Sequence, residues 1–164
     1  MNTMKRLALI GCVALAMTAC KKEEAPAKAD DAQVALVAPS RDDDAGWKDY
    51  LKNVVGQNLG NISNSPYLYY LPPESDPEFQ AKYDRQAESA KAAIGRGVTK
   101  GNMLAFGSSA SAKMADLIVA SFKGVPADTM KGVRVLFIGD AADNPRVQAA
   151  VAPAGVDYVF VEAK

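Results

Sequence analysis

Three short apolar runs near the end of this 164-residue chain constrain its fold most strongly. The runs cover residues 103–106, 133–138 and 156–161, and the stretches between them, 111–123 and 144–152, have the apolar spacing of helices. Strands that alternate with helices predict βαβ units and a parallel sheet with right-handed crossovers. We therefore expect an α/β fold, with a small three-stranded parallel βαβαβ core over residues 102–164.

Two further helices are predicted before this core. Apolar residues follow one helical face from Trp47 to Leu59, and Asp76 before Pro77 is typical of the start of a helix, which we expect to extend to Ile94. We expect both helices to cover one face of the sheet.

A proline-bounded loop at residues 61–75 separates the two predicted helices, and it contains Tyr67, Tyr69 and Tyr70. Tyrosine combines a large apolar ring with a hydroxyl, which suits contact with a protein partner. The same segment could instead pack its rings over the sheet or form an edge strand. The three tyrosines are therefore candidate partner-binding residues, and we expect at least one of them to be packed.

Polar side chains follow the first and second strands of the predicted core. In open parallel sheets, ligands bind beyond the carboxyl ends of the strands. These turns could hold a small ligand or an anion, but the same residue types also cap helices without any ligand. The candidate ligand-binding residues are Ser108, Ser109, Ser111, Asp140, Asp143 and Asn144.

The first of these turns resembles a phosphate-binding P-loop over residues 107–114. Ala112 replaces the second glycine of that motif, and Met114 replaces the hydroxyl residue that would reach Mg²⁺. Both changes remove groups that the mechanism needs, so nucleotide hydrolysis is not expected.

Histidine is absent, and the chain has two cysteines, Cys12 and Cys20. The serine and cysteine triads and the usual zinc ligand sets are therefore excluded. We expect no catalytic residue, no metal and no cofactor. The chain has 19 basic and 19 acidic residues without a clustered basic patch, so we expect no nucleic acid partner either.

The first 20 residues have the order of a secretory signal. Lys5 and Arg6 precede the apolar run 7–16, which is too short to span a bilayer because that takes about 20 residues. The run ends in Met-Thr-Ala-Cys at residues 17–20, which resembles the lipobox of bacterial lipoproteins. The resemblance implies removal of residues 1–19 and attachment of the chain to the lipid bilayer through an acylated Cys20.

Two alternatives remain at this end of the chain. The sequence at residues 9–12 is closer to the lipobox in its letters, but cleavage there would leave an apolar run below the usual minimum of about seven residues. An exported protein with a chance cysteine at position 20 is the other alternative. Lys21 is not the aspartate associated with inner-membrane retention, so the resemblance implies the outer membrane of a Gram-negative bacterium, facing the periplasm.

Residues 20–45 contain few large apolar residues, so we expect a flexible linker there and a single globular domain over residues 46–164. We expect a periplasmic lipoprotein that binds an envelope protein partner without catalysis, as an accessory, assembly or inhibitor protein. The alternative is a small-ligand or anion-binding domain, possibly an enzyme, that uses the two strand-end turns. A shared open pocket at the turns would favour the alternative, whereas closed turns and exposed tyrosines would favour partner binding.

Overall fold

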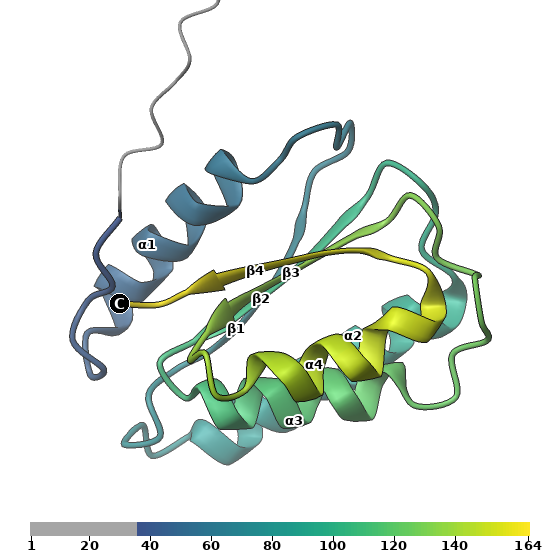
Figure 1. Cartoon of the computed structure of the whole chain (residues 1–164). Helices are drawn as coiled ribbons and strands as arrows, with labels where there is room; N and C mark the ends of the chain where they lie inside the picture. The colour runs from purple at the N-terminus through teal and green to yellow at the C-terminus, as the bar shows by residue number, and fades with distance from the viewer. Residues whose placement is uncertain (1–35) are drawn as a thin grey trace, which may run out of the picture. The chain divides into compact units, whose positions relative to one another are not determined.

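Four parallel strands form the centre of the computed structural model, which describes residues 36–164. They lie in the order β1-β2-β3-β4, so neighbours along the chain are neighbours in the sheet (Figure 1). The strands are β1 (Tyr67–Leu71), β2 (Met103–Ser108), β3 (Arg134–Gly139) and β4 (Asp157–Glu162). The helices are α1 (Asp44–Gln57), α2 (Phe79–Arg96), α3 (Ser111–Phe122) and α4 (Asn144–Val151), and the short 3-10 helix η1 (Ala152–Ala154) follows α4.

The α/β class expected from the sequence is confirmed, but the sheet has four strands rather than three. The additional strand is β1, which pairs with β2 and forms one edge of the sheet. It comes from the tyrosine-containing segment, for which an edge strand was one of the alternatives. Five residues between prolines form too short a pattern to distinguish a strand from a loop in the sequence. Pairing with β2 makes this segment a strand.

The two early helices lie on opposite faces of the sheet, so the expectation that they share a face is wrong. Helix α2 connects the parallel strands β1 and β2, and its right-handed crossover places it on the same face as α3 and α4. Helix α1 precedes the first strand and belongs to no crossover. It therefore covers the face that the three crossover helices leave open (Figure 1).

A row of aromatic rings crosses the sheet on the face covered by α2, α3 and α4. The strand register places Tyr69 beside Phe106, Phe106 beside Phe137, and Phe137 beside Phe160. The Tyr69 and Phe106 rings are stacked with their centroids 4.8 Å apart, and those of Phe137 and Phe160 are 5.7 Å apart. Because all four strands contribute one ring, this row packs the whole width of the sheet against the three helices.

Helix α1 packs a second core against the opposite face. Trp47 and Leu51 are buried there with Met103 from β2 and Leu136 from β3. Strand β3 is consequently buried on both faces, as a central strand of a parallel sheet usually is.

Residues 36–43 contact the domain before α1 begins at Asp44. The amide of Ala38 donates to the carbonyl of Lys164 at 3.0 Å, and the indole of Trp47 donates to the carbonyl of Ser40 at 3.1 Å. Residues 36–45, which the sequence predicts as the end of the linker, therefore contact the domain. The expected signal sequence, Cys20 and the expected linker up to residue 35 lie outside the described residues.

Candidate functional site

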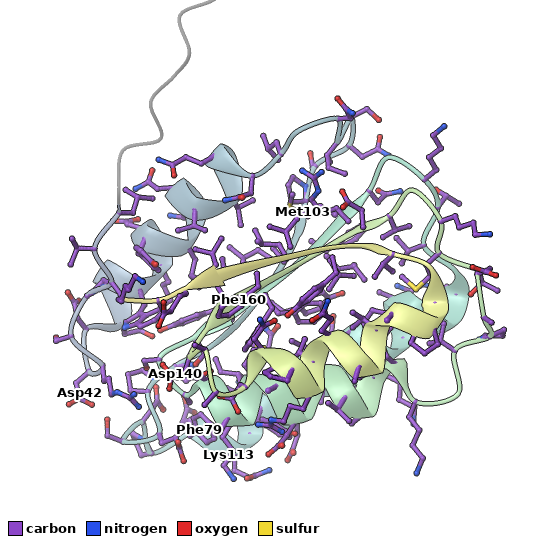
Figure 2. All side chains as sticks on the ribbon, viewed as in Figure 1. Asp42, Phe79, Met103, Lys113, Asp140 and Phe160 are labelled. Carbon is purple, nitrogen blue, oxygen red and sulfur yellow. The ribbon has the colours of Figure 1, made fainter. Side chains whose placement is uncertain are left out.

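The strands all end at one edge of the sheet, because they are parallel. Figure 2 shows Asp42 and Asp140 at this end of the domain, toward which the arrow of β4 points. The turns after β2 and β3 therefore meet here, and they carry the candidate ligand-binding residues Ser108, Ser109, Ser111, Asp140, Asp143 and Asn144.

Ser111 joins the two turns. Its hydroxyl donates to Oδ2 of Asp143 at 2.7 Å and accepts from the amide of Asp140 at 2.8 Å. Gly139 allows this close approach, since a Cβ atom at that position would lie 2.6 Å from Oγ of Ser111 and 2.7 Å from the ring of Phe137. The Ser111 side chain is buried and its hydrogen-bonding groups are used within the protein.

Ser108 makes a similar connection between β1 and β2. Its hydroxyl donates to the carbonyl of Leu71 at 2.8 Å and accepts from the amide of Ala110 at 2.9 Å. It is almost completely buried. The two serines thus fix the strand-end turns to each other and to the sheet.

Asp143 and Asn144 are also engaged. Arg146 donates to Oδ1 of Asp143 through Nε at 3.0 Å and through Nη2 at 2.8 Å, and the hydroxyl of Tyr158 donates to Oδ1 of Asn144 at 2.8 Å. Helix α4 begins at Asn144, yet Asp143 makes no side-chain cap hydrogen bond to it. These polar residues therefore connect turns and strands rather than acting as simple helix caps.

Ser109 and Asp140 line a small depression between the two turns, together with Arg41 and Ser108. Its volume is about 190 Å³, which is below the roughly 300 Å³ at which small-molecule pockets usually begin. Arg41 lies across it, with Nη2 at 3.4 Å from Oδ2 of Asp140 and Nη1 at 3.5 Å from the carbonyl of Ser109. The turns share a depression, and the side chains of Arg41, Ser108 and Asp140 in its lining are engaged, whereas the Ser109 hydroxyl has no hydrogen-bond partner among the described residues.

The three candidate tyrosines occupy different environments. Tyr69 is 5% exposed and belongs to the aromatic row, so it lies in the core rather than on a partner-binding surface. Tyr70 is half-buried, and its hydroxyl donates to Oδ1 of Asp44 at 2.9 Å. Burial and this hydrogen bond raise the pKa of Tyr70, while the hydrogen bond from Lys48 and that from Tyr70 lower the pKa of Asp44.

Tyr67 is 47% exposed and the adjacent Leu68 is 37% exposed. Side chains alternate along a strand, so these two project toward opposite faces of the sheet at its β1 edge. Leu68 was not among the residues selected from the sequence. Its alternation with the tyrosines was the signal that could have identified it.

Two properties of the described domain limit the chemistry further. Within residues 36–164, no three cysteine, histidine or acidic side chains lie close enough together to hold a metal ion. No helix in the same part of the chain is long and apolar enough to cross a membrane.

No protein-family model matches this chain, and no significant similarity to a curated protein or to a solved structure was found. The functional argument therefore depends on the geometry of the domain and on the sequence.

Proposed function

We propose that this chain is a lipid-anchored envelope protein whose domain binds another protein through the β1 edge of its sheet, without catalysis. The anchor is an acylated Cys20, and the domain faces the periplasm from the outer membrane. The observation that carries the proposal is the contrast between the strand-end turns and the β1 edge.

The turns offer little to a ligand. Ser108 and Ser111 each use their hydroxyl both as donor and as acceptor within the domain, and Asp143 accepts from Ser111 and Arg146. A ligand would have to break these bonds, and an unsatisfied buried polar group costs about 1 to 3 kcal/mol. This disfavours the alternative of a small-ligand or anion site at the turns.

The β1 edge offers both backbone and side-chain contacts. An edge strand has unpaired backbone groups along its outer side, and an extended segment of another protein can add to it as a further strand. Tyr67 and Leu68 flank this edge on the two faces, so alternate side chains of such a segment would contact them.

The prolines around β1 restrict how much of another protein can pair with this edge. Pro66 precedes the strand and Pro72 and Pro73 follow it, and β1 itself has five residues. Prolines and a short length protect natural edge strands from open-ended association. The edge therefore suits one short extended segment of an envelope protein.

Site-specific photo-crosslinking in intact cells tests this proposal. A photoreactive amino acid at position 67 should give one discrete crosslinked product, whereas the same amino acid at Val119 on α3 should not. Val119 is a suitable control because it is 37% exposed, as Leu68 is.

A substitution at Leu68 tests whether the crosslinked product depends on the β1 edge. Leu68→Asp places a charge beside the edge and should abolish the product formed from position 67, while Val119→Asp should leave it unchanged. Equal products from positions 67 and 119, or a product that survives Leu68→Asp, would contradict binding at β1.

A further inference from the structure

A second cavity lies at the end of the domain opposite the strand-end turns. It has a volume of about 490 Å³ and is formed by the C-terminal ends of α2 and α3 and by the loop from α3 to β3. Both helices run antiparallel to the strands, so their C-terminal ends lie at the edge where the strands begin. No residue of the strand-end turns or of β1 lines the cavity.

The interior of the cavity is mostly apolar, with one buried hydroxyl. Ile94 and Met130 are buried residues in its lining, and Val98 and Val125 are partly buried. Ser121 also lines it and is only 5% exposed.

Ser121 contributes a hydroxyl to the lining of the cavity. This hydroxyl has no hydrogen-bond partner within residues 36–164. Every fully buried side-chain nitrogen or oxygen atom in this part of the chain has a partner, so the Ser121 hydroxyl is not fully buried. The hydroxyl must therefore be accessible to solvent, and it can be reached through the cavity because Ser121 lines the cavity. It can donate a hydrogen bond to a bound molecule.

Three cationic side chains surround the cavity, namely Lys91, Arg96 and Lys123, and no acidic residue lines it. These three have no ion-pair partner among the described residues, which is also true of Arg85, Lys100 and Lys113 outside the cavity. With three cations and no acidic residue in its lining, the cavity is a locally positive region of the domain.

Helix ends could account for these cations without a ligand, because a helix C-terminus attracts positive charge. Each C-terminus is equivalent to roughly half a negative charge, so α2 and α3 together supply about one. The carbonyls of Ile94 and Phe122 also already accept from the amides of Gly97 and Val125, at 3.0 and 3.1 Å. The three positive charges of these side chains exceed the roughly one negative charge of the two helix ends.

From this arrangement we infer that the cavity binds a small amphipathic anion, with its apolar body on Ile94 and Met130 and its carboxylate, sulfonate or phosphate group near Lys123, Arg96 and the Ser121 hydroxyl. The volume is in the range of small-molecule pockets, which is about 300 to 1,000 Å³. This inference concerns a different part of the domain from the proposed protein-binding edge and does not depend on it.

The test titrates the ¹⁵N-labelled full chain with 2-naphthoate and follows its amide resonances by NMR. Saturable shifts are expected at Gly95, Gly97 and Gly124, which line the cavity, and not at Gly107 and Gly139 near the strand ends. The neutral analogue 2-naphthalenemethanol should bind more weakly, because it lacks the charge that the cations attract.

Charge reversal on one helix supplies the matched variants. Lys123→Glu should raise the Kd for 2-naphthoate by about five-fold or more, while Lys113→Glu, at the other end of the same helix and outside the cavity, should change it by less than about two-fold. Absence of saturable shifts, equal binding of the neutral analogue, or equal effects of the two reversals would overturn the inference.

Discussion

Ser111 shows at the scale of one residue how a candidate ligand-binding group can serve the fold instead. Its hydroxyl is shared between the carboxylate of Asp143 and the amide of Asp140. Ser111→Ala should lower the free energy of unfolding by about 1 to 3 kcal/mol, because both of these groups lose a partner in a buried place. Chemical denaturation measures this loss.

The matched control for that change is Ser75→Ala. Ser75 is exposed and its hydroxyl donates to Asp42 at the surface, so its removal should change stability by no more than about 0.5 kcal/mol. If Ser111→Ala and Ser75→Ala had the same small effect, the bridge between the turns would contribute nothing to stability.

Strand β3 shows at the scale of an element how the sheet stabilises the domain. Phe137 is fully buried in the aromatic row, and Leu136 is fully buried against α1 on the other face. Phe137→Ala should cost about 3 to 5 kcal/mol, since the ring leaves a cavity between two layers. That is a large share of the 5 to 15 kcal/mol that typically stabilises a domain.

Thermal unfolding of the Phe137→Ala variant should show a clearly lowered midpoint. Val119→Ala, which shortens an exposed apolar side chain on α3, should leave the midpoint nearly unchanged. A Phe137→Ala variant as stable as the Val119→Ala variant would show that β3 is not central to the core.

At the scale of the whole molecule, the proposed anchor determines where the domain can act. Cys20→Ser removes the thiol to which the lipid would attach, so the protein should move from the membrane fraction to a soluble or unprocessed form. Cys12→Ser is the matched control and should change neither processing nor fractionation, because Cys12 lies inside the segment whose removal is proposed. Fractionation and mass spectrometry of the N-terminus measure both. Membrane association of the Cys20→Ser variant equal to that of the original chain would exclude the lipid anchor.

The sequence by itself was sufficient for the α/β class and for the strands and the α-helix in the last third of the domain, but not for the 3-10 helix η1. Residues 133–138 and 156–161 are apolar enough to be read as strands, and they differ from β3 and β4 by one residue at each end. Such elements are predictable because buried strands and amphipathic helices leave a periodic pattern that depends on local chain geometry alone.

Tertiary structure alone decided the role of the tyrosine segment, the placement of α1 and the state of the polar turns. Tyr67, Tyr69 and Tyr70 are chemically identical, yet pairing with β2 makes Tyr69 part of the core and leaves Tyr67 exposed at the edge. Ser111 resembles a helix cap in the sequence, and only the packing of β3 beside β2 brings Asp140 and Asp143 to its hydroxyl. These features depend on contacts between residues far apart along the chain, and a local pattern carries no record of such contacts.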